Sequence, residues 1–176
     1  MGTGHRGDPR SLMASAHVGN RAEGPRFIAD CHLGKVAKYL RFMGYDTLFF
    51  PAIDDSELIL RAQEEERTVL TRDALLSRRK NVPVYFLRAI DPAEQLQELS
   101  NAFALRIRGD RQRRCMICNA LLDVIGKAEA SDAVPEKVTS RFDFFQRCPE
   151  CGRIYWHGDH YRNMMAFLND ALAHGV

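Results

Sequence analysis

The sequence has no apolar stretch near the length of about 18 residues that a membrane-spanning helix requires. Its first 25 residues also lack the apolar run of a secretory signal. The 25 basic residues nearly balance the 23 acidic ones, so the net charge does not by itself indicate a protein that binds polyanions. Glycine and proline, at 12 and 7 of 176 residues, are too scarce for a fibrous or disordered chain. We therefore expect a cytoplasmic globular protein that forms either one ordinary domain or one small domain with a compact appendage.

Cysteine is also scarce, but its spacing is informative. Four of the five cysteines form two C-x-x-C pairs, and the fifth stands alone far upstream. In a chain without a secretory signal, this pattern indicates a metal site rather than a disulfide framework. The predicted zinc ligands are Cys115, Cys118, Cys148 and Cys151, and the lone cysteine is Cys31. An iron site or an oxidised dithiol is the alternative.

Two such pairs allow four thiolates to surround one zinc ion tetrahedrally. The residues that follow the pairs, Asn119 and Gly152, tolerate the left-handed backbone that such turns need. Because sulfur would occupy all four coordination positions, no position is left for a water molecule. We therefore predict one structural zinc ion per chain that takes no part in catalysis.

Upstream of the cysteine pairs, strand-like and helix-like segments alternate. The expected strands cover 27–29, 47–50, 68–71 and 84–87, and the expected helices cover 33–43, 56–66 and a segment that begins after Asp91-Pro92. This alternation is typical of a parallel sheet covered by helices on both faces. The predicted fold class is therefore α/β.

Composition divides the chain into five parts. Residues 1–25 have no hydrophobic period, so we expect a flexible leader there. The other expected parts are a sheet domain at 26–105, a basic linker at 106–114, a cysteine module at 115–165 and a C-terminal tail at 166–176. The linker is called basic because residues 106–114 contain five arginines and one aspartate.

Acidic side chains follow three of the expected strands. Asp30, Asp73 and Asp91 each come after a strand, and Asp55 precedes the second helix. Because the carboxyl ends of parallel strands meet at one edge of a sheet, these side chains could converge there. Clustered carboxylates favour Mg²⁺ or Mn²⁺, which can activate water at a phosphodiester. The alternative, strongest for Asp91 before Pro92, is that an aspartate caps the helix that follows it.

Several motifs of the chain occur together and in one order. They are Phe27-Ile28-Ala29-Asp30, Leu33-Gly34-Lys35-Val36-Ala37, Leu40-Arg41-Phe42-Met43-Gly44-Tyr45-Asp46-Thr47, Leu70-Thr71-Arg72-Asp73, Arg114-Cys115-x-x-Cys118-Asn119 and Cys148-Pro149-x-Cys151-Gly152-Arg153-Ile154-Tyr155-Trp156-x-Gly158-x-His160. Through these motifs, residues 26–165 resemble the Mut-seven C-terminal RNase domain family, a branch of the PIN-like nucleases. The resemblance implies a PIN-like three-layer α/β/α domain with a mostly parallel sheet, an acidic metal-dependent site, RNA as substrate and a C-terminal zinc ribbon.

The same resemblance implies roles for single residues. Asp30 matches the first acidic position, Asp55 an intermediate one and Asp73 the acidic residue after the third strand. These three would bind Mg²⁺ or Mn²⁺. Thr71 would orient the first carboxylate, and Asp91 lies near a fourth, less regular catalytic position.

Three neighbours of these positions leave alternatives open. Asp54 is the alternative to Asp55 at the intermediate position. His32 either assists at the site or caps the first helix, and capping is favoured. Cys31 is expected to be a small buried residue rather than a nucleophile, because no general base stands at a suitable spacing.

Basic and aromatic side chains near both modules are candidates for binding RNA. Arginine and lysine contact phosphates, and aromatic rings stack on unpaired bases, so the expected partner is single-stranded RNA. The candidates are Lys35, Arg41, Arg72, Arg111, Arg113, Arg114, Trp156 and His160. The alternatives are that the basic residues form a solvated face, and that Trp156 packs the thin core of a small ribbon.

The leading prediction is a metal-dependent ribonuclease whose zinc ribbon helps to hold RNA. One alternative is a noncatalytic RNA-binding or ribosome-associated adaptor in which the aspartates are only helix caps. Another is a nuclease that acts on DNA. The complete set of acidic positions favours an enzyme over an adaptor, whereas only the family resemblance favours RNA over DNA.

Overall fold

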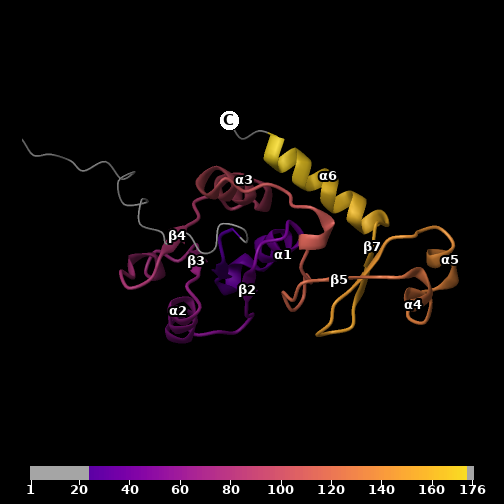
Figure 1. Cartoon of the computed structure of the whole chain (residues 1–176). Coiled ribbons are helices and arrows are strands. Elements are labelled where there is room, and N and C mark those ends of the chain that lie inside the picture. The colour runs from indigo at the N-terminus through magenta and orange to yellow at the C-terminus, as the bar shows by residue number, and fades with distance from the viewer. Residues whose placement is uncertain (1–23, 174–176) are drawn as a thin grey trace, which may run out of the picture.

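The parallel sheet predicted from the sequence is present in the computed structural model of the chain, which describes residues 24–173 (Figure 1). Residues 1–23 of the expected leader lie outside the described residues. The strands are β1 (Phe27–Ala29), β2 (Thr47–Phe49), β3 (Thr68–Thr71) and β4 (Val84–Phe86), in the order β2-β1-β3-β4. All neighbouring strands are parallel, and Phe27 is level with both Thr47 and Thr68.

Helices cover both faces of this sheet. One face carries α1 (Gly34–Phe42) and α3 (Pro92–Phe103), with α6 (Asp159–Ala173) packed on these two helices, and the other carries α2 (Asp55–Glu64) and the 3-10 turn η3 (Leu76–Arg78). Fully buried apolar side chains fill both spaces, for example Leu40 and Leu99 under α1 and α3, and Val69 under α2. The predicted three-layer α/β/α fold is confirmed. No helix within the described residues combines the length and apolar character that crossing a membrane requires.

Local sequence explains where the helices begin and end. Asp54 accepts hydrogen bonds from two amides in the first turn of α2, at 2.9 and 3.0 Å. Asp91 accepts one from the amide of Ala93 at 2.8 Å and precedes Pro92 at the start of α3. Both aspartates therefore cap helices, because they satisfy amides that have no partner within the helix. Gly44, just beyond α1, has a φ of +98°, a backbone conformation that favours glycine.

A second, antiparallel sheet lies next to the cysteine pairs in the chain. Its strands are β5 (Asp123–Ile125), β6 (Phe145–Arg147) and β7 (Ile154–Trp156), in that order. Two short helices, α4 (Lys127–Ser131) and α5 (Glu136–Thr139), lie between β5 and β6. Cys115 and Cys118 precede β5, and Cys148 and Cys151 lie between β6 and β7. This arrangement fits a zinc ribbon.

The last helix returns from the ribbon to the first module (Figure 1). Leu168 of α6 is fully buried in the same apolar cluster as α1 and α3. Phe167 stacks on Tyr39 of α1, with the two ring centroids 4.6 Å apart. The boundary expected at residue 165 therefore falls inside α6, and residues 166–173 belong to a packed helix rather than to a tail.

The expected basic linker is also packed. The amides of Arg108 and Arg114 donate hydrogen bonds to the carbonyls of Met43 and Arg41, both at 3.1 Å. The side chain of Arg113 is buried, with 5% of the residue exposed. Residues 106–114 therefore run along the end of α1 instead of forming a solvated connection.

Candidate functional site

The strand order creates a crevice at the carboxyl edge of the parallel sheet. The chain passes from β1 through α1 to β2, and α2 then crosses to β3 on the other side of β1. Ligands of open α/β sheets bind where the strand order reverses in this way. Asp30 directly follows β1, and Arg72 and Asp73 directly follow β3, so all three lie at this reversal.

Asp30 is the most enclosed acidic side chain at this edge, with 4% of the residue exposed. Its Oδ2 accepts a hydrogen bond from the Thr71 hydroxyl at 2.6 Å, and its Oδ1 accepts one from the amide of His32 at 2.8 Å. Burial opposes ionisation of Asp30, but these hydrogen bonds outweigh burial and hold the pKa of Asp30 below its ordinary value. Asp30 is therefore a buried carboxylate that remains ionised at neutral pH.

Thr71 links this carboxylate to the next acidic residue along the edge. Its buried hydroxyl donates to Asp30 and also accepts a hydrogen bond from the amide of Asp73 at 2.9 Å. The exposed carboxylate of Asp73 accepts from the amide of Leu75 at 2.6 Å. The contact between Thr71 and Asp30 is the one that the family resemblance implies.

Asp55 lies at the same edge and is not used as a cap. Because Asp54 caps α2, Asp55 occupies the first helical position with an exposed side chain. Among the described residues its carboxylate has no hydrogen-bond or ion-pair partner. Burial raises the pKa of the Cys31 thiol, and the neighbouring carboxylate of Asp30 raises it further. The charge of Asp55 adds a weaker effect in the same direction, so Asp55 lies near Cys31.

The structure brings together fewer acidic groups than the sequence predicts. Among the described residues, the ligand atoms of Asp30, Cys31 and His32 lie within 4.8 Å of one another, and neither Asp55 nor Asp73 joins this group. Cys31, expected to be buried, is exposed. The expectation that Asp91 belongs to the site is not supported by its contacts, because Asp91 caps α3.

Two of the predicted phosphate-binding residues flank this edge. Lys35 lies in the first turn of α1 and Arg72 follows β3, and both are exposed. In the described part of the chain, neither has an ion-pair partner. They are therefore available to contact an anion beside Asp30.

Arg41, at the other end of α1, does not fit the phosphate contact predicted for it. It is 3% exposed, and its guanidinium donates to the carbonyl of Thr47 at 2.7 Å. It also donates to the carbonyls of Met116 and Ile117, at 3.0 and 2.9 Å. Its role is to hold the first cysteine turn against the sheet domain.

The four paired cysteines form a group that could bind a zinc ion. All four sulfur atoms lie within 4.8 Å of one another, with 3.6 Å between Cys115 and Cys151 and 3.3 Å between Cys118 and Cys148. Tetrahedral Zn–S bonds of about 2.3 Å place sulfur atoms about 3.8 Å apart, so the group fits the ion. A backbone hydrogen bond from Arg153 lowers the pKa of Cys151 to about 6, which favours the thiolate that zinc binds.

The turns around the sulfur atoms agree with the sequence analysis. Asn119 and Gly152 both have a φ of +72°, as predicted. The hydroxyl of Tyr155 lies 3.2 Å from the sulfur of Cys115, so Tyr155 supports a ligand of the proposed ion from outside the ligand set.

Sequence reasoning missed a buried polar junction between the ribbon and the sheet domain. The side chain of Asn119 accepts a hydrogen bond from the amide of Thr47 at 3.0 Å and donates to Asp46 at 2.7 Å. Asp46 also pairs with Arg67 at 2.6 Å and with Arg114 at 3.6 Å. Burial opposes ionisation of Asp46, but Arg67 and Asn119 outweigh it and lower the pKa of Asp46.

This junction lies at the edge of the sheet opposite the acidic residues. Thr47 begins β2 and Arg67 directly precedes β3, whereas Asp30 follows the carboxyl end of β1. Asp46 and Thr47 stand in one of the motifs that indicated the family, which is the signal that could have pointed to them. The first cysteine turn is therefore built into the base of the sheet domain.

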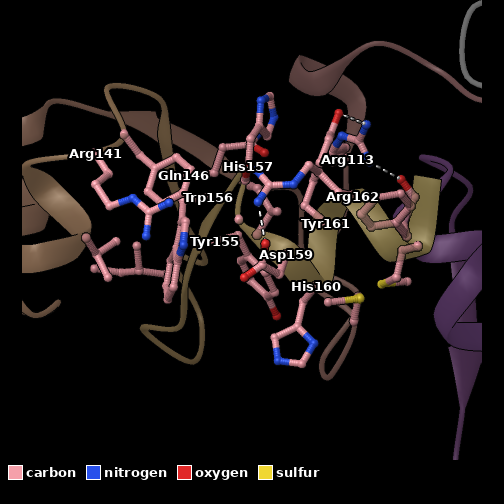
Figure 2. Close-up of a pocket in the computed structure, with 18 of the residues that line it drawn as sticks. Arg113, Arg141, Gln146, Tyr155, Trp156, His157, Asp159, His160, Tyr161 and Arg162 are labelled. Atoms are coloured by element: carbon pink, nitrogen blue, oxygen red, sulfur yellow. Dashed lines mark hydrogen bonds and ion pairs between the residues drawn. The ribbon is translucent and has the colours of Figure 1, made fainter. Parts of the chain in front are cut away.

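A groove of about 560 Å³ lies between the ribbon and the start of α6 (Figure 2). Trp156 and His160, both predicted to bind RNA, line it. Arg113 also reaches it, but its guanidinium lies over the ring of Phe42 at 4.1 Å and donates to the Tyr161 hydroxyl at 3.0 Å. The phosphate contact predicted for Arg113 does not fit this buried position.

Of the remaining linker candidates, the structure describes the side chain of Arg114 only. Arg114 is partly buried and donates to the carbonyl of Asn119 at 2.9 Å. The side chain of Arg111 lies outside the described part of the chain.

Comparison with known proteins identified one family. The family model described as the Mut7-C RNAse domain matches residues 25–168, which include both the parallel sheet and the ribbon. No curated protein and no solved structure matches the chain.

Proposed function

Because the chain belongs to the Mut7-C RNAse domain family, we propose that it is a cytoplasmic, metal-dependent ribonuclease that hydrolyses RNA phosphodiester bonds at the Asp30 edge of the sheet. Family membership by itself indicates a nuclease whose substrate is RNA. The observation that supports the finer proposal is the buried, ionised carboxylate of Asp30, oriented at 2.6 Å by Thr71 where the strand order reverses.

Asp30, Asp55 and Asp73 would hold Mg²⁺ or Mn²⁺. Carboxylate oxygens are the ligands that these ions prefer. Mg²⁺ keeps several of its water molecules and needs only one or two carboxylates, so aspartates that do not touch one another still fit it. When bound, the ion activates water and stabilises negative charge on the phosphodiester.

Other residues of the chain would position the substrate. Thr71 keeps one oxygen of Asp30 fixed. Lys35 and Arg72 would contact phosphates beside the scissile bond, since both are exposed at this edge. We assign nuclease chemistry to the sheet domain, residues 26–105 with α6 packed on it, and support of the RNA to the ribbon that begins at Cys115 and ends before α6. The proposal does not use Asp91, Arg41 or Arg113, because each is engaged within the fold.

A cleavage assay tests this proposal. Zinc-loaded protein should cleave RNA in a mixture of single-stranded RNA, structured RNA and single-stranded DNA, and cleavage should require added Mg²⁺ or Mn²⁺. A folded protein that binds RNA without cleaving it under any of these conditions would favour the adaptor. Equal cleavage of DNA would favour a broader nuclease.

The neighbours Asp54 and Asp55 provide a matched pair of variants. We expect Asp54→Ala to lower the free energy of unfolding by about 1 kcal/mol and to leave cleavage intact, because it removes only the cap of α2. Asp55→Asn should leave stability nearly unchanged and slow cleavage at least about tenfold, since it removes one metal-binding charge. Urea unfolding and initial cleavage rates measure the two effects. The opposite pattern would move the acidic position to Asp54.

A further inference from the structure

We propose that the groove between the ribbon and α6 binds one unpaired base of the RNA, with Trp156 stacking on the base and Lys137 and Arg141 contacting its phosphates. This inference rests on the proposed function for its ligand. The groove has a volume of about 560 Å³, which falls in the range of about 300–1,000 Å³ that is typical of small-molecule sites, so a single nucleotide is a suitable occupant.

The aromatic part of the groove is held in place by the backbone. Trp156 ends β7 and is half-buried, so part of the indole remains open to the groove. A Cβ atom at Gly158 would come within 2.6 Å of the indole Nε1, so the absence of a side chain at this glycine lets the ring lie there. A partly open ring is suited to stack on a base of any identity.

A polar side chain also faces the groove. Gln146 of β6 lines it and is 2% exposed, and its Nε2 donates to the carbonyl of Asp110 at 2.9 Å. Within the described residues, its Oε1 has no hydrogen-bond partner. This oxygen could accept a hydrogen bond from an amino group on a base edge.

The charges around the groove complement a phosphate chain. Lys137 of α5 and Arg141 beyond it are exposed, and neither has an ion-pair partner among the residues that the structure describes. In Figure 2 the Arg141 side chain extends toward Trp156. Asp159 is the one carboxylate among the lining residues, and it pairs with Arg162. The groove therefore offers an aromatic face bordered by basic groups, which is the combination that binds single-stranded RNA.

The groove lies away from the acidic edge. Phe42, the last residue of α1, lines the groove, whereas Asp30 lies just before the start of this helix. A helix of nine residues is about 13 Å long. A bound RNA therefore has to extend over several nucleotides to reach both places, so losing the groove should raise KM and leave kcat nearly unchanged.

Trp156 is the only tryptophan of the chain, so its fluorescence reports directly on the groove. The Asp30→Asn protein would be titrated with a single-stranded RNA of mixed sequence and with an abasic strand of equal length. We expect the RNA to quench the fluorescence and the abasic strand to bind with little quenching. RNA that binds without quenching would overturn the proposal, because the base would then lie outside the groove. That result would favour a protein partner as the occupant of the groove.

Variants separate stacking from phosphate contact. Trp156→Ala should weaken RNA binding about 5- to 150-fold with little change in salt dependence. Lys137→Ala should reduce the slope of log affinity against log salt by about 0.7. Lys127→Ala removes an equal charge from the same ribbon, outside the groove and paired with Asp143, and should change neither quantity. Equal effects of the two lysine variants would overturn the phosphate contact.

Gly158→Ala keeps the groove side chains but displaces the indole, and it should also weaken binding and quenching. Zinc content and circular dichroism show whether each variant is folded, so a folded Gly158→Ala protein with unchanged binding and quenching would overturn the proposal. The proposed nuclease activity is judged separately. Metal-dependent cleavage without quenching rejects only the groove, and quenching without cleavage rejects only the nuclease.

Discussion

Replacing Asp30 with asparagine is expected to reduce RNA cleavage at least about a hundredfold while leaving the protein folded. Metal ions stabilise charge in the transition state by several kcal/mol, and each 1.4 kcal/mol corresponds to about a factor of ten in rate. Asparagine retains the shape: its Oδ1 can still accept a hydrogen bond from the amide of His32, and its Nδ2 can donate one to the hydroxyl oxygen of Thr71. Single-turnover cleavage rates with Mg²⁺ and with Mn²⁺ measure the effect.

Thr71→Val is the matched control for this variant. It removes the hydroxyl that orients Asp30 but leaves the carboxylate, so its activity should fall less than that of Asp30→Asn.

Because the pKa of Asp30 lies below its ordinary value, the stability that the charge contributes should be present at neutral pH and lost as the pH falls through the folded-state pKa. Unchanged cleavage by the folded Asp30→Asn protein would reject the proposed site.

Removing one of the four candidate zinc ligands is expected to destabilise the whole protein rather than the ribbon alone. The sequence suggests that Cys148→Ser would unfold the ribbon and spare the sheet domain. In the structure, the first cysteine turn instead contacts the sheet domain through Arg41 and Asn119. Since tetrathiolate zinc contributes about 10–16 kcal/mol in zinc-finger peptides, Cys148→Ser should lower the unfolding temperature of both modules together.

Hydrogen exchange at the amide of Thr47 tests this coupling directly, because that amide donates to Asn119. In Cys148→Ser its protection should fall together with that of the ribbon. Asn119→Gly preserves the left-handed turn but removes the side chain, and we expect it to cost about 1–3 kcal/mol for each buried partner left unsatisfied. Cys31→Ser is the control and should retain about one zinc ion. A sheet domain that unfolds at its usual temperature without zinc would show that the modules are independent.

Local sequence patterns predicted the parts of the fold that local interactions determine. The alternation of strands and helices, the cap at Asp91 and the turns at Asn119 and Gly152 each depend on a few neighbouring residues. The residues of the candidate acidic edge could also be predicted from the sequence, because the strand ends of a parallel sheet meet at one edge.

Long-range contacts explain what the sequence could not reveal. Lys35, Lys38 and Arg41 share one side of α1 by their spacing, yet Arg41 is buried because carbonyls 75 and 76 residues away accept its hydrogen bonds. No local period indicates such partners. In the same way, the apolar face of α6 gave no sign that it packs on α1 and α3 rather than on the ribbon.

The position of α6 also imposes an order on folding during synthesis. The ribosome releases α1 and α3 before the ribbon, and the ribbon before α6. Until α6 emerges, the apolar surface that Leu168 and Phe167 will cover stays open to water. Nascent chains with such open surfaces are prone to aggregate. The four paired cysteines and the ribbon strands emerge before α6, so the sheet domain becomes complete only after the whole ribbon segment has left the ribosome.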